Sequence, residues 1–303
     1  MGKDHASAWN DFWADNVESD GGGCLPAGWQ GIDAVQQSAW VEFAKGLPQK
    51  ARLLDIATGD GRVLGWIAEN RGDLKLTGCD LAQELPAPPT KAKIHTSVAM
   101  EDLPFRDDFF SAAVSQFGFE YGDTEKAARE IARVVEPGGA IAFMTHRADG
   151  PILAHNLARR EQIAWVVEEQ DLFAIAKRSL ALRGTGIAIF PPKIASAPLE
   201  GAQRFGARSA AWEISEAIRQ TLMMGQRDLP ANVARTLDTI ALKAKNELGR
   251  IASLEAACNT TKDEIAFLAA CTAGGLQQVS STPLREGPDA APFADFRVFR
   301  HAD

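Results

Sequence analysis

The sequence predicts an α/β protein with a mostly parallel, seven-stranded sheet, an antiparallel last strand and a helical insertion after the fifth strand. Three observations predict this fold. Strand-like apolar runs alternate with helical spacing over residues 31–149. A strand, a glycine turn and a helix follow one another at residues 51–69. The stretch from Asp149 to Asn259 shows mainly helical spacing, which the sheet itself does not need.

The first residues predict a short helix followed by a hinge. Trp9, Phe12 and Trp13 form an aromatic stripe at helical spacing within residues 5–17, and the glycines and proline of residues 18–31 indicate a flexible connection. The stripe either packs on the main body or covers a ligand site as a lid. A second helix is expected from Ile32 to Leu47.

The central stretch is the place where a ligand can approach the chain. An apolar run at residues 53–56 is typical of a strand covered on both faces, and apolar residues recur at helical spacing over residues 63–67. Between them, Gly59 and Gly61 permit a turn that a ligand can contact closely. Asp55 stands at the carboxyl end of the strand.

A second carboxylate follows the second predicted strand, residues 74–81. The spacing from Gly61 to Asp80 suits a helix and a returning parallel strand, so Asp55 and Asp80 should face one crevice. An acid there can accept hydrogen bonds from two ribose hydroxyls, which suits a nicotinamide dinucleotide or S-adenosylmethionine. Leu64 occupies the third place of the dinucleotide pattern G-x-G-x-x-G, which weakens the first alternative.

The segments after the second strand distinguish the two candidate ligands, a nicotinamide dinucleotide and S-adenosylmethionine. Short strands are expected at residues 94–98 and 110–117 around a loop, and the segment AMEDLPFRDDFFSAAVSQF spans residues 99–117. A helix from Asp123 should stop at Pro137-Gly138-Gly139, before a fifth strand at residues 140–145.

These motifs resemble the class I S-adenosylmethionine-dependent methyltransferases, which have a Rossmann-like fold. Residues 51–69 resemble the acid-x-G-x-G-x-G pattern of that family, with Ala57 at the first glycine. Residues 99–117 resemble the D-A-E-x-L-P-F-x-D-x-x-F-D segment of its small-molecule and quinone-type members, and ARVVEPGG is similar to its helix-turn-strand signature. The resemblance covers about residues 31–148 and 260–303.

The resemblance implies a cofactor, S-adenosyl-L-methionine, and the residues around it. The loop at residues 100–102 would hold the adenine through its backbone, because Ala99 replaces the aspartate that leads this loop in the family. The end of the fourth strand would lie beside the methionyl group. The residues expected to bind the cofactor are Asp55, Ala57, Thr58, Gly59, Gly61, Asp80, Leu81, Met100, Glu101, Asp102, Ser115 and Gln116.

Three residues are candidates for the chemistry. Methyl transfer from a sulfonium is an in-line displacement, so it needs alignment and, for a hydroxyl acceptor, a base. His146 ends the fifth strand and is the first choice, because an imidazole changes charge near neutral pH. A structural, hydrogen-bonded histidine is the alternative. Glu120 and Tyr121 follow the fourth strand and could bind or deprotonate the acceptor.

The insertion and the chain end complete the prediction. Residues 1–30 form a lid and hinge, residues 31–149 with 260–303 the cofactor-binding core, and residues 150–259 a helical cap or a dimerisation element. Within the insertion, residues 184–201 read as an apolar, proline-rich loop. Thr260 or Thr261 should cap a helix ending near Cys271, before a final strand pair with a polar turn.

Composition argues against several classes of protein and of site. The net charge of −8 opposes the basic footprint of nucleic-acid binding, and no apolar run approaches the roughly 20 residues of a membrane helix. Without an apolar signal region we expect a cytoplasmic protein with no membrane partner. The four cysteines form no C-x-x-C pair, so no metal site is expected.

The sequence therefore predicts a methyltransferase that transfers a methyl group from S-adenosylmethionine to a small-molecule or peptide-like acceptor, at a hydroxyl or carboxylate oxygen. The apolar cap favours an uncharged or amphipathic acceptor. Two alternatives stay open: a nicotinamide-dependent oxidoreductase, and a non-catalytic S-adenosylmethionine-binding regulatory protein.

Overall fold

The computed structural model describes residues 9–10, 12–13, 29–88, 92–187 and 189–302. The chain forms two compact units, residues 1–153 with 252–303 and residues 154–251. Of the predicted N-terminal helix, Trp9, Asn10, Phe12 and Trp13 are described and helical, and the predicted hinge lies mostly outside the described residues.

The first unit is built on a seven-stranded sheet with the order β3-β2-β1-β4-β5-β7-β6. Its strands are β1 (Arg52–Ile56), β2 (Lys75–Cys79), β3 (Lys93–His95), β4 (Phe110–Gln116), β5 (Val135–His146), β6 (Leu276–Leu284) and β7 (Ala294–His301). The first five strands are parallel, and β7 is antiparallel to both of its neighbours. The predicted fold class is confirmed. The position of β7 between β5 and β6 distinguishes this order from the 3-2-1-4-5-6 order of dinucleotide-binding folds.

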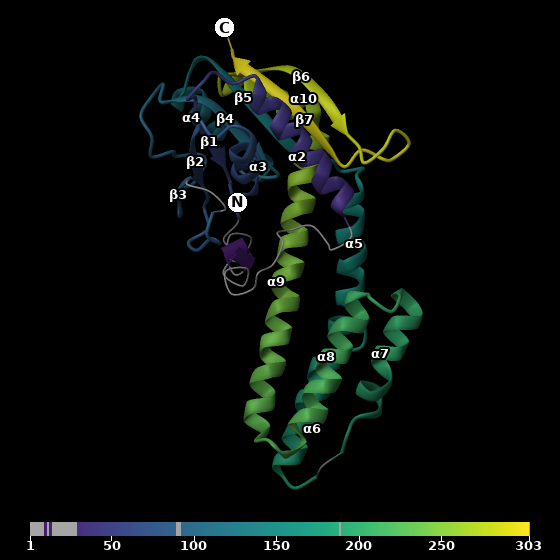
Figure 1. The fold of residues 1–303 in the computed structure, drawn as a ribbon. Helices are drawn as coiled ribbons and strands as arrows, with labels where there is room; N and C mark the ends of the chain where they lie inside the picture. Colours follow the sequence, from purple (N-terminus) through teal and green to yellow (C-terminus); the bar gives the residue numbers. More distant parts are fainter. Residues whose placement is uncertain (1–8, 11, 14–28, 89–91, 188, 303) are drawn as a thin grey trace. The chain divides into compact units, whose positions relative to one another are not determined.

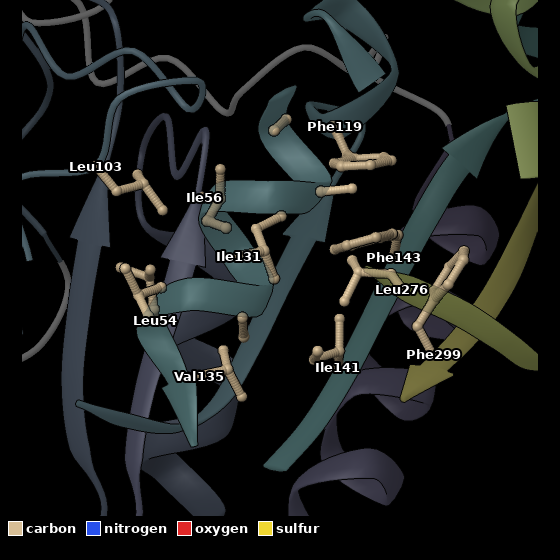
Figure 2. Close-up of a cluster of buried hydrophobic side chains, with 14 of the residues drawn as sticks. Leu54, Ile56, Leu103, Phe119, Ile131, Val135, Ile141, Phe143, Leu276 and Phe299 are labelled. Carbon is tan, nitrogen blue, oxygen red and sulfur yellow. The ribbon is translucent and has the colours of Figure 1, made fainter. Parts of the chain in front are cut away.

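Helices cover both faces of this sheet (Figure 1). They are α2 (Gln30–Lys45), α3 (Arg62–Asn70), α4 (Thr124–Val134) and α10 (Glu264–Ala273). On one face, α4 and α10 pack over an apolar core that includes Leu54, Ile131, Phe143, Phe267 and Phe299. Figure 2 shows how the labelled members of this core gather above the strands.

The alternation of side chains along β7 separates the two faces. Phe299 belongs to the core under α4 and α10, whereas the ring of Phe296 lies 4.9 Å from that of Trp40 on α2. Trp40 is fully buried, so α2 is held on the opposite face of the sheet. This three-layer arrangement leaves the carboxyl ends of β1, β2, β4 and β5 along one edge.

The predicted boundary between the fourth helix and the fifth strand was wrong. Pro137-Gly138-Gly139 does not stop the helix, because α4 has already ended at Val134 and β5 begins at Val135. The register between β4 and β5 shifts between Phe110 and Ala112, so the proline and glycines lie in an irregular part of the strand.

The second unit is helical. It begins within α5 (Pro151–Ala164), which leads into the π-helix η2 (Trp165–Glu169). The unit then contains α6 (Leu172–Gly184), α7 (Pro192–Phe205), α8 (Ala210–Met224), η3 (Gly225–Arg227) and most of α9 (Pro230–Lys262). Its larger apolar core joins α6, α7, α8 and the start of α9 and includes Leu172, Leu180, Ile194, Ile218 and Leu237.

Two further predictions were wrong, one in this unit and one at the start of α10. The loop predicted at residues 184–201 is shorter, because Pro191-Pro192 starts α7 and Pro198 is accommodated within that helix. The predicted cap at Thr260 or Thr261 lies inside α9. The side chain of Asp263 caps α10 instead, accepting a hydrogen bond from the Ala266 N–H.

No helix in the described ranges combines the length and apolar character needed to cross a bilayer.

Candidate active site

Two carboxylates contact the turn after β1. Asp55 and Asp80 are both buried. The Thr58 hydroxyl donates to Asp55 Oδ2 at 2.6 Å, and the Gly59 N–H donates to Asp80 Oδ2 at 3.0 Å. Since Thr58 and Gly59 are neighbours, both acids converge on one turn, as the spacing predicted.

Burial places these carboxylates in unusual electrostatic surroundings. Desolvation raises the pKa of Asp55 to about 7, and the nearby negative charges of Asp80 and Asp60 add to the effect, although the Thr58 hydrogen bond opposes it. Burial also raises the pKa of Asp80, against hydrogen bonds from the Ala82 and Gly59 N–H groups. Desolvation and the neighbouring carboxylates both oppose ionisation of Asp55, so a ligand with a cationic or hydroxyl group would stabilise its ionised form.

The turn depends on close backbone packing. Ala57 has φ +55°, in the left-handed region that favours glycine, at the position where the methyltransferase pattern has glycine. A Cβ added to Gly118 would lie 2.4 Å from the Ala57 Cβ. Gly118 therefore lets the chain after β4 approach the turn after β1.

The N-terminal aromatic residues lie against the same turn. A Cβ on Gly59 would meet the Trp13 indole at 2.5 Å, so this ring fills the space directly beside the glycine. Asn10 Oδ1 accepts a hydrogen bond from the Gln83 N–H, and Trp9 contacts the Tyr121 ring edge to face. A ligand bound beside Gly59 would have to displace Trp13.

Side chains at the end of β4 have different roles. The Ser115 hydroxyl donates to the Ile56 carbonyl and accepts from the Phe119 N–H, so it fastens β4 to β1. Gln116 accepts from the Trp40 indole N–H at 2.6 Å and donates to Gln36 Oε1 at 3.2 Å. Both residues were predicted to contact the cofactor. The hydroxyl hydrogen of Ser115, its only donor, is already used in the bond to the Ile56 carbonyl.

The predicted adenine loop lies next to the start of α4. Glu101 Oε1 accepts from the Asp123 N–H, and a Cβ on Gly122 would meet both Glu101 and Met100. Asp102 is exposed, and so is the side chain of Leu81, directly after Asp80. The Leu81 side chain is therefore accessible to a ligand bound near Asp80.

The three candidate catalytic residues lie together. His146 Nδ1 is 2.8 Å from Glu120 Oε1, which also accepts from the His146 backbone N–H at 2.8 Å. Both residues are buried, and Glu120 Oε2 has no hydrogen-bond partner among the described atoms. The Tyr121 ring stands 5.8 Å from the imidazole. In the tautomer that donates Nδ1–H to Glu120, Nε2 is the basic nitrogen of His146.

Phe117 supports the imidazole and was not predicted as a site residue. Its ring stacks on His146 with centroids 4.1 Å apart, and its backbone has φ +54°, which is strained for an aromatic residue. The sequence signal that could have found it is Phe117-Gly118 directly after an apolar strand. Gln36 and Trp40 were also missed, since on α2 they appear only as members of a buried face.

A cavity of about 340 Å³ adjoins His146. It lies between the end of β5, the start of β7 and the junction of α9 with α10. Most of its charged residues form ion pairs, Arg147 with Asp149 and Asp295, and Arg297 with Glu264; Lys262 also lines it. Its volume is at the lower end of the range for small-molecule sites.

Residues 54–143 match the family described as methyltransferase domain. The chain carries a methyltransferase domain. It is 34% identical over 117 residues to a demethylmenaquinone methyltransferase of Corynebacterium kroppenstedtii, covering 37% of this chain and 48% of that protein. The predicted resemblance to class I S-adenosylmethionine-dependent methyltransferases is confirmed.

Two other proteins illustrate the range of similarity. A tRNA (carboxymethyluridine(34)-5-O)-methyltransferase of Arabidopsis thaliana is 30% identical over 118 residues, covering 35% of this chain and 27% of that one. An S-adenosylmethionine-dependent methyltransferase of Thermotoga maritima, a possible histamine N-methyltransferase, has a TM-score of 0.37 at 16% identity, covering 52% of this chain and 69% of that chain. The chain spans about half the length, or less, of the curated relatives it matches.

Proposed function

We propose that this protein is an S-adenosylmethionine-dependent methyltransferase that acts on a small amphipathic acceptor and uses His146, oriented by Glu120, as its base. The observation that carries the proposal is the buried Glu120–His146 pair, on the same edge of the sheet as the turn between Asp55 and Asp80.

The residues around the turn fit the proposed cofactor. Asp80 would accept the ribose hydroxyls, Leu81 and the backbone of Met100 and Glu101 would hold the adenine, and Asp55 would face the amino group. When bound, S-adenosylmethionine supplies an electrophilic methyl group on a sulfonium. The cofactor's positive charge and hydroxyl groups would stabilise the ionised forms of both aspartates, whose pKa values are raised in the free protein.

The proposed base has a defined proton path. His146 Nε2 would accept the proton that the acceptor hydroxyl loses when it is methylated, and S-adenosylhomocysteine would be the other product. Glu120 stabilises the resulting imidazolium through Nδ1. Glu120 is thus a positioning residue, and Tyr121 closes the site beside the ring.

The acceptor is proposed to have a polar end. The cavity beside His146 is lined largely by charged residues, which favours an acceptor with hydrogen-bonding groups over a wholly apolar one. Methylation at oxygen is our first proposal. Methylation at a ring carbon next to a hydroxyl is the second, favoured by a relative from Bdellovibrio bacteriovorus named as a ubiquinone/menaquinone biosynthesis C-methyltransferase. Removing the hydroxyl proton activates either atom.

Calorimetry with S-adenosylhomocysteine and with reduced nicotinamide dinucleotide tests the cofactor. We expect binding of the first alone. Binding of the dinucleotide instead would favour the oxidoreductase, and tight S-adenosylhomocysteine binding without turnover on a broad acceptor panel would favour a regulatory protein.

Turnover of His146→Asn tests the base. We expect a loss of about 100-fold or more in kcat at saturating cofactor. The matched control is His155→Asn, which changes a histidine of the helical unit and should leave kcat unchanged. An unaltered kcat for His146→Asn would remove this residue from the mechanism.

A further inference from the structure

One end of the helical unit carries exposed apolar side chains. This end comprises the end of α6, the chain leading to α7, the end of α8 with η3, and the start of α9, which Figure 1 shows side by side. We name its six exposed apolar residues the apolar tip: Leu182, Ile187, Ile189, Met223, Met224 and Leu229. Met224 is 84% exposed and Leu229 is 69% exposed, so these side chains add almost nothing to the core.

The backbone beneath the apolar tip is held in place. Arg183, at the end of α6, donates to the carbonyls of Gly225 and Asp228 at 2.8 and 2.9 Å, which joins α6 to the segment between α8 and α9. The Ile187 N–H bonds to the Leu182 carbonyl. The apolar side chains are therefore presented by a fixed framework, and their exposure is a property of the fold.

The charge around the apolar tip is opposite to that of the whole chain. Residues 182–193 and 222–235 contain Arg183, Lys193, Arg227 and Arg235 against one acid, Asp228, whereas the chain as a whole has a net charge of −8. An acidic protein would be repelled by an anionic membrane over most of its surface. Only a basic, apolar end could approach such a surface favourably.

From this combination we infer that the apolar tip docks peripherally on the surface of an anionic lipid bilayer. Methionine and leucine enter the boundary between headgroups and acyl chains, and the exposed Arg227 and Arg235 face the lipid headgroups. This mode needs no membrane-spanning helix. It departs from the sequence-based expectation of no membrane partner, because that expectation considered only spanning segments. It does not depend on the proposed methyl acceptor.

Vesicle sedimentation of the full-length protein tests the inference. We expect the protein to pellet with vesicles of phosphatidylcholine and phosphatidylglycerol, and much less with phosphatidylcholine alone. The double variant Met224→Glu/Leu229→Glu should bind the mixed vesicles at least tenfold more weakly. Arg227→Gln and Arg235→Gln should each weaken binding to the mixed vesicles about fivefold and reduce the preference for anionic lipid.

The matched control is Leu199→Glu/Leu242→Glu, which adds the same charge at exposed leucines of the same unit outside the apolar tip. It should sediment like the wild type, and circular dichroism should show both double variants folded. Equal loss in the control, or no sedimentation of the wild type, would overturn the inference. A wild-type dimer that Met224→Glu/Leu229→Glu converts to a monomer, without vesicle binding, would assign the apolar tip to self-association instead.

Discussion

One oxygen of Glu120 accepts two hydrogen bonds from His146, one from its backbone N–H and one at Nδ1, both 2.8 Å long. The pair is buried where η1 follows β4 and β5 ends, and the Phe117 ring stacks on the imidazole. Backbone and side chain of His146 are thus fixed by the same carboxylate, so the direction of Nε2 is set before any acceptor binds.

Glu120→Gln should therefore lower kcat more than it changes binding. The amide oxygen of glutamine can still accept both hydrogen bonds, but it cannot stabilise an imidazolium by charge, and we expect kcat to fall about 10- to 100-fold. KM for the acceptor and calorimetric affinity for S-adenosylhomocysteine should change little. Glu125→Gln, on the exposed side of α4, is the control. A fall confined to KM would assign Glu120 to acceptor binding.

The raised pKa of Asp55 predicts that cofactor affinity depends on pH. The folded protein keeps a proton on this carboxyl up to a pH of about 7, whereas the amino group of the cofactor prefers the ionised form. Affinity for S-adenosylhomocysteine should therefore rise with pH up to about 7 and then level off. Calorimetry in buffers of different ionisation enthalpy should detect proton release below that pH. A flat profile in the wild type would contradict the assignment, and Asp55→Asn should give such a profile.

The same carboxyl should affect stability without ligand. Because its folded-state pKa lies above the unfolded value of 3.8, the folded state binds the extra proton, so its stability falls as the pH rises from about 4 to about 7. The effect is about 1.4 kcal/mol for each unit of pKa difference. Urea unfolding at several pH values should show this slope in the wild type, and Asp55→Asn, which retains an acceptor for Thr58, should reduce it.

Trp13 should report occupation of the turn. Its indole fills the space beside Gly59, so a bound cofactor must move it and change its solvent exposure. Tryptophan fluorescence should change when S-adenosylhomocysteine binds, and most of that change should vanish in Trp13→Phe. Trp212→Phe, which alters an exposed tryptophan of the helical unit, is the control. An identical signal in Trp13→Phe would place the ligand away from this ring.

The contact between Ala57 and Gly118 can be tested by a double-mutant cycle. Ala57→Gly removes a side chain from a left-handed position and should stabilise the fold by about 0.5–1 kcal/mol. Gly118→Ala would bring two Cβ atoms within 2.4 Å and should destabilise it by about 1–3 kcal/mol. Because Ala57→Gly removes one of those atoms, it should recover part of the loss. Additive changes in the free energy of unfolding would show that the two positions do not interact.

The sequence by itself determined the core of this protein, because its signals are local. Apolar runs and glycine turns fix β1, α3 and β2, and strands followed by returning helices force parallel pairing, so the meeting of Asp55 and Asp80 at one turn followed from spacing alone. Local signals gave wrong element boundaries where the same residues are compatible with two different structures. Pro137-Gly138 indicates the end of a helix, yet α4 had already ended at Val134. Pro191-Pro192 indicates a loop, although proline is also common at the first position of a helix, and here it begins α7.

Only the tertiary structure decided which of the candidate residues act together. Glu120 and His146 are 26 residues apart, and no sequence pattern predicts that one would orient the other. Their pairing exists because β4 and β5 are adjacent and end at the same edge, which brings the loop after one strand over the last residue of the next. The contact of Trp13 with Gly59 has the same origin, since it joins segments that no periodicity links. Spacing along the chain specifies elements, whereas side-chain partners are chosen by packing between them.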